Sequence, residues 1–125
     1  MAERLTVEQH RRITEIQDYL KVVERVKHLV GELDANRAAP SRVLQSTCET
    51  IARELSQLRQ RALTSNVGTI ADVAGAMSVM AGRGGGIHMK IRGLADGVNS
   101  LMMQLDHALK AAATPTPKRE GDGPT

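Results

Sequence analysis

Residues 44–62, LQSTCETIARELSQLRQRA, decide the fold class of this chain. Their apolar positions alternate at spacings of four and three without a break: Leu44, Cys48, Ile51, Leu55, Leu58 and Ala62. This is the spacing of an α-helix that buries one face. Ser41 stands where a helix cap is expected, and Gly68 follows the last apolar position as a stop signal. The pattern predicts a helix over residues 41–65.

The segment before it carries a second amphipathic pattern. Thr6 followed by Gln9 forms a capping box, in which each side chain bonds the backbone N–H of the other residue. The apolar residues downstream recur at three and four: Ile13, Ile16, Leu20, Val23, Val26, Leu29, Val30 and Leu33. Pro40 disfavours helix at the residue before it. We therefore expect a long helix over residues 6–36.

Two further helices flank a glycine-rich loop, Gly82-Arg83-Gly84-Gly85-Gly86, whose four glycines each cost about 1 kcal/mol in a helix relative to alanine. The helix expected over residues 69–82 has the apolar face Ile70, Val73, Met77 and Met80. The helix expected over residues 87–112 has the apolar face Ile87, Ile91, Leu94, Val98, Leu101, Leu105 and Leu109. Each also has a face of small residues: Ala71, Gly75, Ser78 and Gly82 in the first, Gly93, Gly97 and Ser100 in the second. We expect these two small faces to meet in a tight antiparallel hairpin.

The expected fold class is thus all-α. Residues 1–113 form an antiparallel helical bundle of three long helices and one short helix, and residues 114–125 form a disordered tail. The third helix is about 20 Å long, against about 37–45 Å for the others, at about 1.5 Å per residue. This mismatch predicts an uncovered apolar groove. A second copy would cover it, so we expect a homodimer or a larger, coiled-coil-like assembly.

Composition excludes several classes of protein. The chain has one Tyr and neither Phe nor Trp, which disfavours sandwich and small-barrel folds and rules out sites built on aromatic stacking. Cys48 alone makes neither an internal disulfide nor a multi-cysteine zinc site. We find no secretory signal and no apolar run long enough to span a membrane, so a cytoplasmic location and no membrane partner are expected. The net charge of +3 produces only a weak electrostatic field, which does not argue for a nucleic-acid partner.

Two groups of polar residues have both a functional and a structural interpretation. Glu24, His28 and Glu32 share one helix face and offer metal donors, but they also continue a pattern of salt-bridged surface, which we favour. No metal and no cofactor are therefore expected. Basic residues near the end of the second helix are candidates for nucleic-acid contact: Arg53, Arg59 and Arg61. Arg59 and Arg61 also lie in the last turns of this helix, where cations complement the helix dipole. Nucleic-acid binding is therefore not the favoured interpretation.

The glycine loop and its surroundings are the candidate binding site. Successive free amides with Arg83 beside Gly84, Gly85 and Gly86 suit an anion, although the order of a P-loop is absent. A hinge or a tight turn between close-packed helices is the favoured alternative. If the loop moves, the short helix swings away and offers a methionine surface, formed by Met77, Met80 and Met89, to a partner. The plainer interpretation is that these methionines fill the core.

The run His88-Met89-Lys90-Ile91-Arg92-Gly93 resembles histidine phosphotransfer domains, where a solvent-facing imidazole on a helical bundle accepts a phosphoryl group and a nearby Lys offsets its charge. The resemblance covers about six residues. In that family the motif is His-x-x-Lys-Gly, and two more helices follow the histidine helix. Here Lys90 comes two residues after His88, Gly93 comes five after, and no further helix follows. The resemblance implies a phosphoryl-accepting role for His88.

Well-specified apolar faces without a catalytic constellation favour a non-enzymatic helical interaction or scaffold module, bacterial in character. It is expected to self-associate and to present helix faces to a protein partner. The candidate binding residues are Met77, Met80, Arg83, Gly84, Gly85, Gly86 and His88, with no catalytic residue. The alternatives are a histidine phosphotransfer-type signalling protein that uses His88 and a small nucleic-acid-associated protein.

Overall fold

The structure is a computed structural model in which residues 5–115 are described. It contains four helices, α1 (Val7–Ala35), α2 (Ser41–Ala62), α3 (Ile70–Gly82) and α4 (Ile87–Ala113), and the described residues include no strand. The expected all-helical class and the four helices are confirmed. The disordered tail expected from residue 114 onward lies outside the described residues, except for Thr114 and Pro115.

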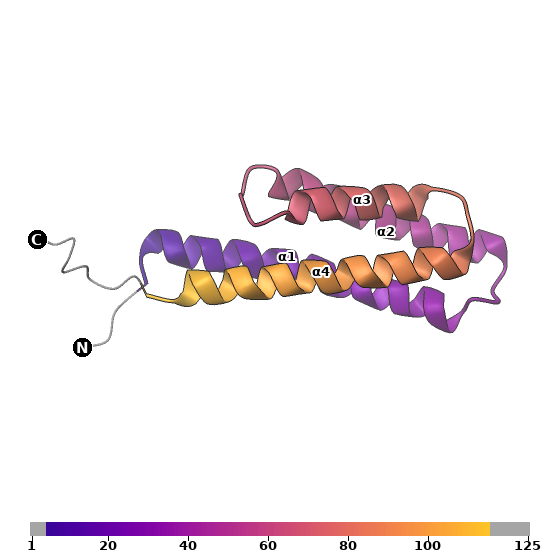
Figure 1. Cartoon of the computed structure of the whole chain (residues 1–125), viewed down its shortest axis with the longest axis horizontal. Coiled ribbons are helices and arrows are strands. Elements are labelled where there is room, and N and C mark those ends of the chain that lie inside the picture. The colour runs from indigo at the N-terminus through magenta and orange to yellow at the C-terminus, as the bar shows by residue number, and fades with distance from the viewer. Residues whose placement is uncertain (1–4, 116–125) are drawn as a thin grey trace, which may run out of the picture.

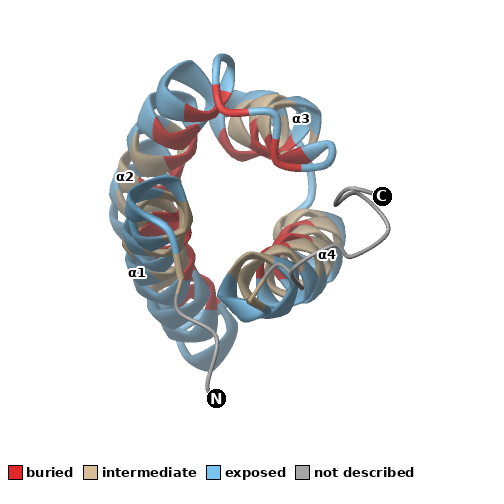
Figure 2. Ribbon diagram, turned by 90° about the vertical axis from the view of Figure 1, so that its left-hand side faces the viewer, coloured by how far each residue is buried: buried red, intermediate tan, exposed pale blue. Residues whose placement is uncertain are grey.

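The helices lie along one long axis, and each runs opposite to the one before it (Figure 1). Consecutive helices contact each other, and α4 returns to contact α1. In the described residues the backbones of α1 and α3, and those of α2 and α4, stay farther apart than the backbones of these neighbouring pairs. Viewed along the axis, the four helices surround a common interior toward which their buried positions face (Figure 2).

The caps at the helix starts agree only partly with the sequence patterns. The capping box of α1 is formed, because the Gln9 N–H donates to Thr6 Oγ1 at 3.0 Å and the Thr6 N–H donates to Gln9 Oε1 at 2.8 Å. The expectation that Ser41 caps α2 is wrong. Pro40 holds the cap position in extended backbone, and Ser41 is the first helical residue.

Every apolar face predicted from the sequence is covered within the single chain. Among the described residues, no side chain of the predicted apolar faces is exposed, and most are fully buried. The expectation of an uncovered apolar groove beside the short helix is therefore wrong. A second copy of the chain is not needed to cover such a groove, so the argument for a dimer from helix lengths does not hold. The connection between α2 and α3 supplies the missing cover, since Val67 is only 3% exposed and Ser65 only 7%.

Polar contacts hold that connection on the neighbouring helices. The Arg12 guanidinium of α1 donates to the backbone carbonyls of Ser65 and Asn66, the latter at 3.0 Å. On the other side, Gln104 Oε1 of α4 accepts from the Thr69 N–H at 2.8 Å and from the Thr69 hydroxyl at 3.1 Å. The connection thus links α1 to α4 at the end where α3 begins.

The small faces of α3 and α4 do not meet each other, contrary to expectation. On α3, the Ser78 hydroxyl donates to the Ala52 carbonyl of α2 at 3.0 Å, and Arg59 of α2 lies across Gly75.

The glycines of α4 receive methionine side chains of α3 instead. A Cβ at Gly93 would collide with the end of Met80, and one at Gly97 would lie 2.6 Å from Met77 Cγ. The glycines of α4 therefore make room for side chains rather than for a second backbone.

Candidate functional site

The loop between α3 and α4 contains more glycine than its backbone requires. Gly85 has φ +132°, a conformation that only glycine adopts without strain. A Cβ at Gly82, Gly84 or Gly86 would meet nothing within 4 Å, and none of these three has a positive φ. The fold therefore requires glycine at one position, and the other three glycines leave the backbone bare to solvent.

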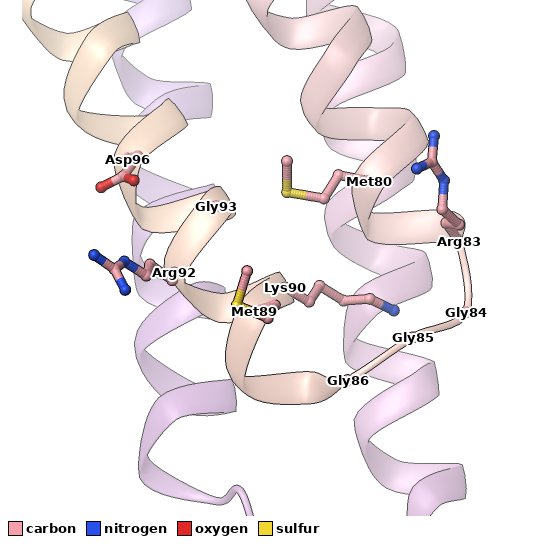
Figure 3. Close-up of a pocket in the computed structure, with 10 residues that line it drawn as sticks. All are labelled: Met80, Arg83, Gly84, Gly85, Gly86, Met89, Lys90, Arg92, Gly93 and Asp96. Atoms are coloured by element: carbon pink, nitrogen blue, oxygen red, sulfur yellow. The ribbon is translucent and has the colours of Figure 1, made fainter.

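A groove of about 440 Å³ opens beside this loop, between the end of α3 and the start of α4. Its apolar part is made by Met80, Met89 and Gly93. Met80 reaches from α3 toward Gly93 on α4, and Met89 lies at the mouth of the groove (Figure 3). Met89 is 73% exposed, which leaves its thioether available for contact.

The rim of this groove is basic. Arg83, Lys90 and Arg92 line it, against a single acid, Asp96. In the described part of the chain none of the three cations forms an ion pair or a side-chain hydrogen bond. The lining of this groove thus carries a net positive charge, three cations against one acid, next to apolar surface.

A second groove, of about 420 Å³, lies on the other face of the loop against α2. It shares Arg83, Gly84, Gly85 and Lys90 with the first groove and is closed by α2 residues that include Cys48. Burial raises the pKa of the Cys48 thiol above its ordinary value; Lys90 opposes this shift, and Glu49 adds to it. The thiol is 3% exposed, as the position of Cys48 on the apolar face of α2 predicted.

Five of the seven candidate binding residues line the first groove together: Met80, Arg83, Gly84, Gly85 and Gly86. Met77 does not, because it is 2% exposed and packs in the core against Gly97. His88 is exposed on the surface, outside both grooves around the loop, with its Nδ1 in contact with the Arg37 guanidinium.

Met89, which was expected to form a methionine surface for a partner, also lines the groove; the remaining groove residues were absent from the sequence-based candidates: Lys90, Arg92, Gly93 and Asp96. Part of the signal was present, because Met89, Gly93 and Asp96 are spaced four and three apart and so share one helix face. What the sequence lacked was the rotation of α4 that turns this face toward the end of α3.

The other polar groups singled out in the sequence form local contacts. His28 Nε2 lies 3.0 Å from Glu32 Oε2, and no group of residues in the described ranges is arranged to hold a metal ion.

The three α2 arginines considered for nucleic-acid contact are similarly engaged with their own chain. Arg59 lies across Gly75, and the Arg61 guanidinium sits 5.4 Å from the centre of the Tyr19 ring. Arg53 donates to the Thr50 hydroxyl at 3.3 Å. These contacts do not produce a continuous basic stripe along α2.

Comparison of the chain with protein-family models, curated proteins and solved structures finds no match. Within the described residues, no helix combines the length and the apolar character needed to cross a membrane.

Proposed function

We propose that this chain is a non-enzymatic helical interaction module, with its helices in an antiparallel bundle, that self-associates and presents helix faces to a protein partner. The observation that carries the proposal is the groove beside the glycine loop. It joins exposed methionine surface to bare backbone, and the fold itself explains neither feature. Methionine adapts its shape to varied surfaces, and glycine lets another chain approach the backbone closely.

Blocking the groove without disturbing the fold tests the proposal. A Gly84→Gln variant adds a side chain where nothing lies within 4 Å, so the fold should be retained. Gly31→Gln is the matched control, because Gly31 is also free of neighbours but lies on the exposed face of α1. Selection from a library of displayed random peptides against the chain should yield binders that Gly84→Gln rejects and Gly31→Gln retains. A selection that yields no binder contradicts the proposal.

Self-association has a different basis from the one the helix lengths suggested. With the apolar faces covered, it must use side chains that point outward, such as Val79 of α3 and Met103 of α4, which are 57% and 73% exposed. Sedimentation velocity should show association that grows with concentration and is weakened by Val79→Ser with Met103→Gln. Val43→Ser on α2 is the control. A monomer at high micromolar concentration contradicts self-association.

A phosphoryl-accepting role for His88 is the second candidate. It is supported by the exposure of the ring and by the cation of Arg37 against its Nδ1. Incubation with a small phosphoryl donor such as phosphoramidate should then give an acid-labile adduct that His88→Gln abolishes. Equal labelling of the exposed His10 and His107 would contradict a specific role for His88.

A further inference from the structure

We propose that the groove between α3 and α4 binds an acidic segment of a partner protein that carries an apolar anchor residue. The anchor enters beside Met80, Met89 and Gly93, and the carboxylates of the segment face the basic rim. This inference rests on the interaction function proposed above and narrows it to one chemistry.

The charge at the groove selects the sign of the partner. Arg83, Lys90 and Arg92 form no ion pair among the described residues, and all three lie around this one groove. A single acid, Asp96, shares the groove with the three unpaired cations. A partner that brings carboxylates gains attraction at this rim, and a basic partner meets repulsion.

The floor of the groove selects an apolar anchor. Gly93 contributes no side chain, so the end of Met80 lies against its backbone and lines the groove, and Met89 stands 73% exposed at the mouth. A leucine, isoleucine or methionine side chain placed there removes apolar surface of both partners from water, which favours association. Because two of the bare glycines, Gly84 and Gly86, border the same groove, the backbone of the partner can approach this edge closely.

Nucleic acid and free phosphate fit the groove less well. Single-stranded nucleic acid binds through aromatic stacking platforms, and Tyr19, which is the one aromatic residue of the chain, is 2% exposed. Free phosphate would make no use of the exposed Met89, so sensitivity to Met89 separates a peptide from a simple anion.

The probe is a displayed library of random peptides of about 16 residues, enough for about four helical turns. Selection against the full chain should enrich peptides that combine Asp and Glu with Leu, Ile or Met. One enriched peptide, synthesised with a fluorescent label, then measures affinity by anisotropy, with protein kept dilute so that self-association does not contribute.

Two pairs of variants test the contacts. Arg83→Glu, Lys90→Glu and Arg92→Glu together should weaken binding of the peptide by about tenfold or more, since each exposed charge contributes modestly. Lys21→Glu, Lys27→Glu and Arg42→Glu make the same change of net charge on α1 and α2 and should change affinity less than about twofold. Met89→Gln should weaken binding, whereas Val7→Gln, equally exposed at the start of α1, should not.

The outcomes separate this inference from the broader function. Enriched peptides that are basic or uncharged, or that bind the rim-reversed chain equally well, overturn the acidic-partner inference and leave the interaction function standing. Displacement of the labelled peptide by inorganic phosphate or by a single-stranded oligonucleotide also overturns it. Enrichment of no peptide overturns both proposals.

Discussion

The substitution Gly97→Ala tests how α4 packs against α3, because the structure predicts two opposing effects of this substitution on the stability of the fold. Alanine in place of glycine within a helix gains about 1 kcal/mol from backbone propensity. At Gly97, however, the new Cβ would lie 2.6 Å from Met77 Cγ and 2.9 Å from Met77 Cε. Met77 is 2% exposed, so it has no solvent to move into. Overpacking of this kind costs about 1–3 kcal/mol, which leaves a net loss of about 1 kcal/mol of stability.

The sign of this effect should reverse when Met77 is shortened. In a Met77→Ala chain the collision is gone, and Gly97→Ala should stabilise by about 1 kcal/mol through propensity alone. The coupling energy between the two positions is then about 2 kcal/mol. Gly93→Ala is the matched control, because Met80 is only half-buried and meets the new Cβ with the flexible end of its side chain, so no loss of stability is expected.

Urea unfolding followed by far-ultraviolet circular dichroism measures all the variants. Met77→Ala alone should cost about 2–5 kcal/mol, so a stabilising osmolyte keeps that background folded. The packing argument is refuted if Gly97→Ala stabilises the chain equally with and without the Met77 side chain.

Three further predictions concern the helix ends and the thiol. Gly86→Ser supplies a side-chain cap that α4 lacks and should raise stability by a few tenths of a kcal/mol; a lower urea midpoint would contradict the extended cap backbone at Gly86. Thr6→Ala removes the Oγ1 bond to the Gln9 N–H and should cost about 1 kcal/mol, with faster amide exchange confined to the first turn of α1; unchanged exchange there would contradict it. Because burial raises the Cys48 pKa, the unfolded chain loses the thiol proton first, so stability should fall as pH rises above about 8.5, the ordinary thiol pKa. Cys48→Ala should abolish this component of the pH dependence, and an unchanged profile would contradict it.

Helix existence and the buried faces could be predicted from the sequence because both depend on residues three and four apart. Every predicted apolar face is buried or half-buried in the structure. The choice of neighbours could not be predicted, because a stripe of small residues indicates a close approach without indicating what approaches. Gly75 is crossed by an arginine of α2, and Gly97 receives a methionine of α3. The burial of Val67 could not be predicted either, because this residue lies in the connection between α2 and α3, where no helical periodicity indicates which side chains are buried.

The candidate site was predictable where it depends on loop composition and unpredictable where it depends on helix rotation. The glycines and Arg83 stand together in the sequence, and the structure keeps them together around one groove. His88 follows the same loop but points away from the groove to Arg37. Lys90 and Arg92 join the rim only because α4 is rotated to place Gly93 against Met80, which depends on long-range packing.

The most direct test of the account is amide chemical-shift mapping of the chain with a selected peptide. The account predicts that the shifted amides cluster in the glycine loop and the adjoining turns of α3 and α4, over residues 79–96, and that Gly84→Gln abolishes the shifts. Shifts that cluster on the outer faces of α1 and α2, and that survive Gly84→Gln, would contradict the assignment of this groove as the interaction site.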